Sequence, residues 1–407
     1  MSYTIEPNTV SSPVFPVYFR NNRTSTADVQ NVICTLYADS EAIGTWRKSW
    51  GSSGFGYDFD IDTRSFIERS IAPFKDAKTS FFGALNSKGF ISNTDAFVPY
   101  YLYTELEVRN SSGFLETVLG SGETSSTLYA VNAVLPLSDP FMSDYYQPSA
   151  GGDFKFLNDG AIAQDISTNE AYFLSYLQKG TNAANFIFYS STGTEIRNVV
   201  VDAGNDEDDE GMLTIKCGMA QMLGTGSWSI LSGTLPTSFN SVAYYTVSVG
   251  LWEVGAYTRK SEIRRFNKVE SCSWNRRVYW FGRLGGCEQY TFKGRIEQKQ
   301  KDTGQIIQFA PTWNIDFATP VNSYSRGIAK TDTTSQISLD ITEPLTTDTA
   351  TWLRYIRRSP EVYILDEANN YIPVTVEPGE ALIDLTRTGQ FELKLSLILS
   401  NENAQEL

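Results

Sequence analysis

Hydrophobic and polar residues alternate along many short stretches of the chain, and a period of two is the pattern of half-buried β-strands. The clearest case is Phe391-Glu-Leu-Lys-Leu-Ser-Leu-Ile-Leu399, where apolar residues occupy every second position. Asparagine, serine, glycine and proline separate stretches of this kind and favour turns. The pattern therefore predicts a mainly β fold: tandem antiparallel β-sandwich domains with one or two short helices.

Residues 1–140 are predicted to form an N-terminal β-domain with a short helix. Ser65 and Glu68 make the capping-box pattern of a helix start, and Pro73 is expected to end this helix. The other expected elements are strands at 14–19, 29–37 and 57–61, a turn-rich break at 21–23 and a hairpin at 100–119. Prolines and glycines between 136 and 152 mark the expected boundary to the next domain.

Residues 150–267 contain short strand-like stretches at intervals of about 8 to 12 residues with turn residues between them, which is typical of an immunoglobulin- or fibronectin-like β-sandwich. The expected strands are 171–177, 185–189, 195–201, 212–217 and 242–252. The sequence therefore predicts a second domain made of two packed sheets.

Residues 268–407 are predicted to form a C-terminal β-domain with a central hairpin and a short helix. Val278-Tyr-Trp-Phe281 and the alternating stretch 290–296 form the hairpin strands, and Gly285-Gly286 allow the tight turn. A helix is expected over 348–358, capped by Asp348 and stopped before Pro360. Further strands are expected at 306–309, 337–341, 361–365, 371–376 and 391–399.

Charge and composition exclude several classes of function. The 407-residue chain has a net charge of −14, which argues against general nucleic-acid binding, because phosphate contacts need clustered Lys and Arg. It contains no histidine, which excludes Ser-His-Asp, Cys-His and HExxH catalysis. No P-loop, GxSxG or GxGxxG sequence is present. We therefore expect a protein that is not an enzyme and has no cofactor.

The four cysteines, Cys34, Cys217, Cys272 and Cys287, form no CxxC pair and are expected to be buried free thiols. A Cys272–Cys287 bridge across the hairpin is the alternative. The N-terminus lacks the order of a signal peptide, and no run of about 18 apolar residues occurs. Synthesis as a soluble polypeptide in a host cytoplasm, with no membrane partner, is expected.

Carboxylates provide candidates for two kinds of site. The acidic run 202–211 includes the weak calcium candidates Asp206, Asp208 and Asp209, although its spacing does not fit an EF-hand and a solvated turn explains the charges. Glycoside hydrolysis needs only two carboxylates, so a carboxylate-dependent glycosidase stays an alternative function. No metal site is expected.

Aromatic residues provide the other alternative. Trp46, Trp50 and Trp228 are candidates for stacking against sugars, and the Gly/Ser-rich stretch 46–56 is expected to be a loop. This hypothesis describes a carbohydrate- or receptor-binding surface module. Packing inside the core or in a subunit interface is the competing explanation for the same residues.

The central hairpin also resembles a known group of proteins. Its aromatic strand, followed by Arg283-Leu-Gly-Gly286 and then Thr291-Phe292, is similar to a segment of tail-associated structural proteins of tailed phages and prophages, particularly those of Bacteroidota. Ser261-Glu-Ile-Arg-Arg-Phe266 resembles the strand that leads into that segment. Cys287 and Glu288 stand where an aromatic residue and an aspartate are expected. The resemblance covers residues 240–300.

A second resemblance lies around Trp352-Leu353 and Ser359-Pro-Glu-Val-Tyr363, which is similar to phage tail proteins of the distal-tail or ring type. Together the resemblances imply a structural protein of the virion tail, as a ring, adaptor or distal-tail component. Its partners would be copies of itself in a ring and other tail proteins. The residues expected to make assembly contacts are Trp280, Phe281, Arg283, Leu284, Tyr290, Phe292, Trp352 and Tyr355.

Overall fold

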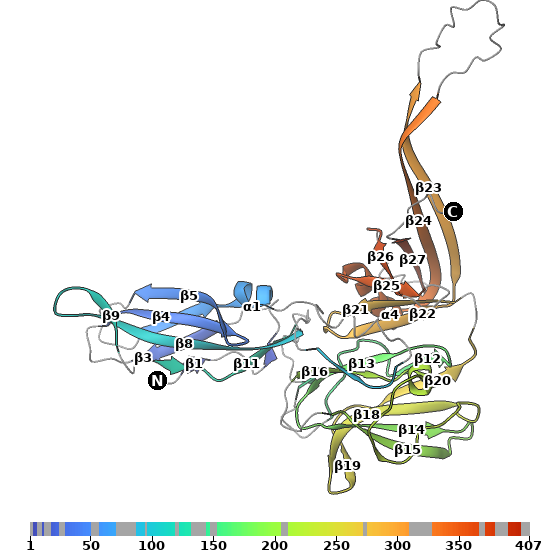
Figure 1. The fold of residues 1–407 in the computed structure, drawn as a ribbon, viewed down its shortest axis with the longest axis horizontal. Helices are drawn as coiled ribbons and strands as arrows, with labels where there is room; N and C mark the ends of the chain where they lie inside the picture. The colour runs from blue at the N-terminus through green and yellow to red at the C-terminus, as the bar shows by residue number, and fades with distance from the viewer. Residues whose placement is uncertain are drawn as a thin grey trace, which may run out of the picture. The chain divides into compact units, whose positions relative to one another are not determined.

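The computed structural model describes a mainly β protein with few short helices, as the sequence pattern predicts (Figure 1). The residues described are 3–5, 10–11, 18–23, 29–49, 57–70, 87–93, 96–118, 122–131, 144–146, 153–204, 211–271, 275–308, 328–365, 371–378 and 390–399. The chain divides into two compact units. Unit 1 comprises residues 1–271 and 281–289, and unit 2 comprises residues 272–280 and 290–407.

The N-terminal part of unit 1 contains two sheets. The three-stranded sheet has the order β1 (Tyr3–Ile5), β3 (Tyr18–Arg23), β6 (Tyr57–Asp62). The seven-stranded sheet has the order β2 (Val10–Ser11), β11 (Leu128–Val131), β8 (Phe97–Arg109), β4 (Val29–Ala38), β5 (Glu41–Ser49), with β9 (Leu115–Thr117) and β10 (Glu123–Thr124) also paired to β8. Alternate residues of β4 are buried, as a period of two requires.

The helix expected near Ser65 is α1 (Arg64–Ser70), which begins two residues earlier than a helix capped by Ser65 would begin. The Asp62 carboxylate accepts a hydrogen bond of 3.0 Å from the Arg64 N–H at its start. Phe66 of α1 packs edge-on against Trp46 with ring centroids 4.8 Å apart. Trp46 lies in strand β5, which runs to Ser49, so the prediction of a loop over 46–56 is wrong for residues 46–49. Residues 50–56 lie outside the described residues.

The middle part of unit 1 is a sandwich of two sheets. The first has the order β12 (Ala163–Ser167), β20 (Arg264–Val269), β18 (Tyr244–Glu253), β14 (Ala183–Tyr189), β15 (Glu195–Asp202), β17 (Ile230–Ser232), with β19 (Ala256–Arg259) paired to β18. The second has the order β13 (Phe173–Gln178), β16 (Gly211–Lys216), β7 (Phe90–Ser92). A large apolar core that includes Tyr176, Phe186 and Val247 lies between them.

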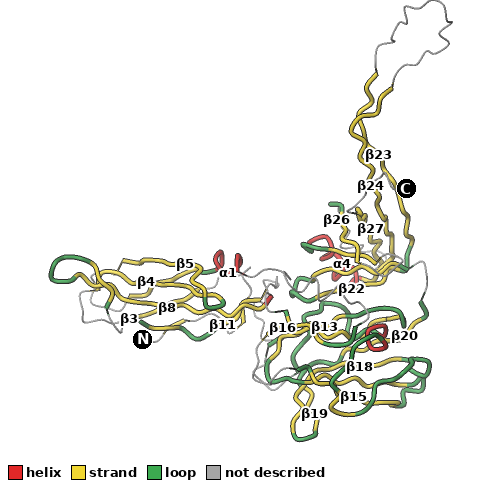
Figure 2. Tube along the Cα trace, viewed as in Figure 1, coloured by secondary structure: helices red, strands yellow, loops and turns green. Residues whose placement is uncertain are grey.

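Unit 2 is built on one seven-stranded sheet. Its order is β22 (Cys287–Phe292), β21 (Arg276–Phe281), β25 (Val362–Leu365), β26 (Tyr371–Val376), β27 (Gln390–Leu399), β24 (Ile328–Thr346), β23 (Arg295–Gln308). The helical segments α4 (Thr347–Leu353) and η2 (Arg354–Arg358) follow β24 (Figure 2). The helix expected over 348–358 is therefore confirmed in place, and its second half is a tighter 3-10 helix. The prediction that Asp348 caps it is wrong, because the N-cap residue is Thr346 and Asp348 lies in the first turn.

Three further differences from the predictions concern local structure. Residues 21–23, expected to be a turn, belong to strand β3. The helix α3 (Met219–Leu223) was not predicted, because it is only five residues long. Cys34, Cys217 and Cys287 are buried free thiols, as expected, so the alternative bridge to Cys287 is wrong. Unit 1 holds the residues of the first two predicted domains, and the division into three domains stays a prediction.

Candidate functional site

The tip of the central hairpin is closed by backbone hydrogen bonds between glycines. The Gly282 N–H donates to the Gly286 carbonyl at 2.9 Å, and the Gly285 N–H donates to the Gly282 carbonyl at 3.1 Å. Gly285 has a φ of 83°, a conformation that glycine adopts without steric cost. A Cβ atom at Gly286 would lie 2.3 Å from the Leu157 carbonyl oxygen, so only glycine fits there.

This tip covers the open edge of strand β13, whose other edge pairs with β16. The Gln289 amide accepts a hydrogen bond of 3.0 Å from the Phe173 N–H and donates one of 3.2 Å to the Phe173 carbonyl. Asn158 accepts from the Ser175 N–H at 2.8 Å and donates to the Cys287 carbonyl at 2.7 Å. Two side-chain amides thus replace the missing neighbouring strand.

Burial of β13 on both faces follows from this arrangement. All six of its residues are buried, whereas a strand with one wet face alternates. Leu174 and Tyr176 belong to the core of the sandwich. Ser175 lies between these two residues, so its side chain is on the other face of the strand. Its hydroxyl accepts a hydrogen bond of 3.4 Å from the Cys287 N–H of the hairpin tip. The tip is therefore an integral part of unit 1.

Charged groups fasten the tip to the segment that follows Asn158. Arg283 donates two hydrogen bonds to the Asp159 carboxylate, 2.6 Å from Nε and 2.9 Å from Nη2. The Asp159 N–H donates to Oε1 of Glu288, which is fully buried. Bidentate arginine–carboxylate pairs are geometrically specific, so this pair orients the tip as well as holding it.

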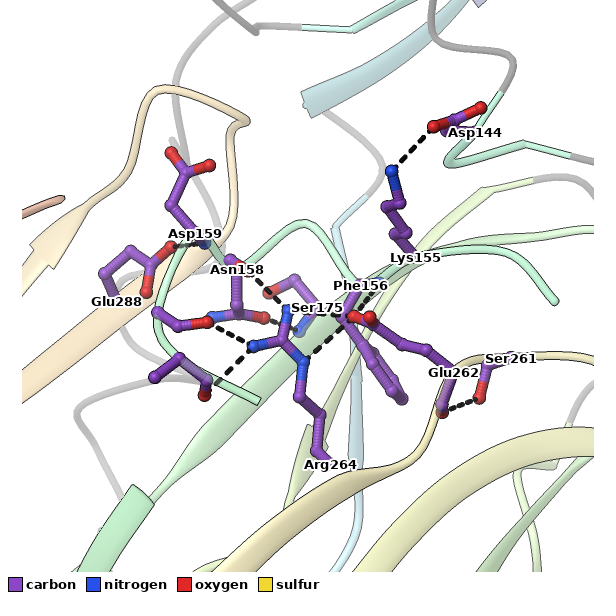
Figure 3. Close-up of polar contacts among 12 residues, drawn as sticks. Asp144, Lys155, Phe156, Asn158, Asp159, Ser175, Ser261, Glu262, Arg264 and Glu288 are labelled. Carbon is purple, nitrogen blue, oxygen red and sulfur yellow. Dashed lines mark hydrogen bonds and ion pairs between the residues drawn. The ribbon is translucent and has the colours of Figure 1, made fainter. Parts of the chain in front are cut away.

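Arg264 also binds the segment that follows Asn158 (Figure 3). Its guanidinium donates to the carbonyls of Asn158 at 2.6 Å and Ala161 at 3.3 Å, and also to the Gly160 carbonyl. Glu262 pairs with Arg264 at 2.8 Å and accepts the Phe156 N–H at 3.1 Å. A buried arginine paired with a carboxylate and with carbonyl oxygens has its hydrogen-bonding groups satisfied, so Arg264 fixes the position of this segment.

The pKa of the Glu288 carboxyl is raised from its usual 4.5 to about 8. Burial is the largest cause and the negative charge of Asp159 adds to it, whereas hydrogen bonds and the positive charge of Arg264 act in the opposite direction. Its Oε2 atom is buried without a hydrogen-bond partner among the described residues. A carboxyl in this position is most stable when it is protonated and neutral. The charge of Glu288 therefore depends on the pH near neutrality.

This arrangement is suited to fastening a strand and unsuited to hydrolysis. Asp159 and Glu288 are close enough to interact electrostatically, but Glu288 has no exposed surface for a substrate to reach. Among the residues that the structure describes, no group of three or more His, Cys, Asp or Glu side chains is placed to hold a metal ion. The calcium candidates Asp206, Asp208 and Asp209 lie outside the described residues.

The structure corrects the expected assembly contacts. Five of the eight residues are buried within the chain: Trp280, Phe281, Leu284, Phe292 and Trp352. Trp280, Phe292 and Trp352 belong to the apolar core of unit 2, where the rings of Trp280 and Trp352 lie 5.5 Å apart. These five side chains are not available to a neighbouring copy, because aromatic residues suit a core as well as an interface. Arg283, Tyr290 and Tyr355 are partly exposed.

Substitution of Trp280 by alanine is therefore expected to destabilise unit 2 rather than to block assembly of folded copies. Loss of a fully buried tryptophan leaves a large cavity and costs about 3 to 5 kcal/mol. Urea denaturation followed by far-UV circular dichroism measures this change. Replacement of the exposed Arg358 by alanine is the matched control and should leave the midpoint unchanged. Equal midpoints for Trp280→Ala and the wild type would contradict the packing role.

The sugar-stacking candidates do not form an exposed platform in the described part of the chain. Trp228 is buried, with Phe90 packed edge-on at 5.3 Å between ring centroids. Trp46 is half-buried against Phe66. Trp50 lies outside the described residues. The two described tryptophans therefore have packing roles.

Most residues of the tip network were not found from the sequence. Asn158, Asp159 and Gln289 have no local pattern, because each binds at least one partner that lies more than a hundred residues away along the chain. The one available signal is the pair Glu288-Gln289, two polar residues inside an otherwise apolar strand. Such a pair in a buried strand needs hydrogen-bond partners from elsewhere in the fold.

Comparison with known proteins identifies no family for this chain. A scan against models of protein families finds no match, and a search of curated proteins also finds none. Within the described residues, none of the helices has the length and apolar character needed to cross a membrane. Arguments about function therefore depend on the residues themselves.

Proposed function

We propose that the protein is a non-enzymatic structural component of a phage virion, a tail ring, adaptor or distal-tail protein that assembles into a homo-oligomeric ring. The observation that supports this most is that polar side chains at the hairpin tip and around it bind backbone groups within their own unit. Asn158, Gln289 and Arg264 all bind backbone groups of the same unit. Polar groups committed to internal hydrogen bonds rigidify a protein, which a building block requires.

The segment that carries the resemblance to tail proteins is the same segment that closes the edge of β13. Arg283 and Gly286 of that segment have specific roles in this closure, as ion-pair partner and as the residue in closest approach to Leu157. The residues that carry the resemblance are therefore residues that this close packing requires. This coincidence favours a related structural role over a chance likeness.

A long ribbon in unit 2 gives independent support. Strands β23 and β24 pair from Arg295 to Gln308, but β27 pairs with β24 only at residues 338–346. Residues 328–337 of β24 pair with β23 but with no third strand among the described residues, so this part of the two strands forms a two-stranded ribbon (Figure 1). A two-stranded ribbon is marginally stable alone in water, so it favours a protein with a binding partner.

The chain's charge is consistent with protein partners. A net charge of −14 opposes binding to a phosphate backbone, so copies of the chain and other tail proteins are the proposed partners rather than nucleic acid. Closed rings also leave no unpaired strand edge at which further copies could add without limit. The proposed location is accordingly the tail of the virion.

Mass photometry of the purified full chain tests the proposal. The expected result is one dominant species whose mass is an integral multiple of the monomer mass and is independent of time. A single monomeric species at every concentration and salt would contradict it. A glycan array and a hydrolysis assay with the same preparation should both be negative; binding or turnover would favour the carbohydrate-binding or glycosidase function.

A further inference from the structure

The β18–β19 hairpin extends beyond the strands beside it. Strand β14 pairs with β18 as far as Gly250, and residues 251–253 then pair only with β19 among the described strands (Figure 1). Asn182 fastens the hairpin at this point: its amide accepts from the Trp252 N–H at 2.7 Å and donates to the Trp252 carbonyl at 3.2 Å. The projecting turn is therefore held firmly at its base.

Val254 occupies an unfavourable conformation at the apex of this hairpin. Its φ is 50° and that of Gly255 is 80°, so both central residues of the turn are left-handed. Turns of this kind favour Asn or Gly, because a Cβ branch crowds the backbone when φ is positive. Valine is the least suited type of residue here. A strained residue at an exposed position is a reason to look for a function.

The same side chain is almost completely exposed. Val254 has 98% of its surface accessible, against 71% for Phe114 and 61% for Ile162, the next most exposed large apolar residues described. Gly255 and Ala256 on one side of it are also exposed and carry no charge, whereas Glu253 on the other side is an exposed acid. The apex is thus a small apolar knob on a rigid support, and rigid contact groups lose little conformational entropy on binding.

We infer that Val254 is a contact between copies of this chain, with the apex of the β18–β19 hairpin packing against an apolar surface of the next copy. This inference rests on the proposed homo-oligomer. Copies that each carry a net charge of −14 repel one another, and a contact made by an uncharged apolar group adds nothing to this repulsion. Contact between two different patches of identical copies is the head-to-tail arrangement from which rings are built.

Replacement of Val254 by asparagine separates this contact from any role in folding. Asparagine tolerates a positive φ, so Val254→Asn should melt at the same temperature as the wild type or higher. It removes the apolar knob, so self-association measured by sedimentation velocity should weaken by about tenfold or more. Val254→Gly relieves the same strain and should behave alike. Ile162→Asn, at another exposed apolar residue of unit 1, is the matched control and should associate like the wild type.

The outcomes distinguish this inference from the proposed function. An oligomeric wild type with Val254→Asn and Val254→Gly variants that associate equally well would overturn the inference and leave the proposed function standing. Equal weakening by Ile162→Asn would also overturn it, because any exposed apolar residue would then suffice. A wild type that stays monomeric in low and high salt would overturn both.

Discussion

Unit 1 of the wild-type chain is expected to lose stability as the pH rises from about 5 to 8, and the Glu288→Gln variant is expected to lose that dependence. The pKa of Glu288 is about 8 in the folded protein and near 4.5 when the carboxyl is solvated. The folded state therefore binds the proton more tightly than the unfolded state. Stability from this group is complete below pH 4.5 and is lost as the pH rises to about 8.

The size of the effect follows from the two pKa values. Each pH unit in this interval costs about 1.4 kcal/mol, which sets an upper limit of about 5 kcal/mol at pH 8. Glutamine keeps an acceptor for the Asp159 N–H and carries no charge, so Glu288→Gln should be the more stable protein at pH 8. At pH 5 the two proteins should be nearly equal.

Urea denaturation of the wild type, Glu288→Gln and a control variant, Glu253→Gln, at several pH values measures how the stability of each protein depends on pH. Glu253→Gln removes an exposed acid from the same unit and should retain the wild-type slope against pH. The charged groups that face Glu288 are Asp159 and Arg264, and both are present in every variant. Parallel curves for the wild type and Glu288→Gln would show that Glu288 does not titrate in this interval.

Substitution of Gly286 by alanine is the second change with a large expected effect. The new methyl group would lie 2.3 Å from the Leu157 carbonyl oxygen and 3.2 Å from the Ser175 Cβ. The nearest atom belongs to the backbone, so it has no rotamer with which to move aside. Overpacking in such a site costs about 1 to 3 kcal/mol, and displacement of the tip would also break the hydrogen bonds that cover β13.

Amide hydrogen exchange distinguishes local displacement from a general loss of stability. In Gly286→Ala, the Phe173 and Ser175 amides should exchange much faster, because Gln289 and Asn158 would no longer accept their hydrogen bonds. Gly211→Ala is the matched control, since nothing lies within 4 Å of a Cβ at that position. Unchanged protection of both amides in Gly286→Ala would refute the close fit.

The success of the sequence predictions has a physical cause in each case. The five strands predicted for the sandwich were placed within about two residues, because alternation and turn residues are local properties of the chain. The shorter strands β7, β12, β17 and β19 were not predicted. The positive φ at Gly285 and the helix before Pro360 were predicted for the same reason. Local signals therefore sufficed for most of the fold.

The candidate site needed information that is not local. Phe173 to Gln178 reads as a strand, but nothing near it in the sequence indicates that a hairpin over a hundred residues later covers its edge. The aromatic residues of that hairpin were expected in an interface between copies. Trp280 lies in a core instead, since burial of a large ring is favourable in either place.

Under the proposed function, the protein acts by assembling with copies of itself into a closed ring. Negative-stain electron microscopy of the purified full chain, with class averages sorted by symmetry, makes such a ring visible. Ring-shaped particles with one rotational symmetry and a central opening are expected. Fields of single, asymmetric particles the size of one chain would refute the proposal.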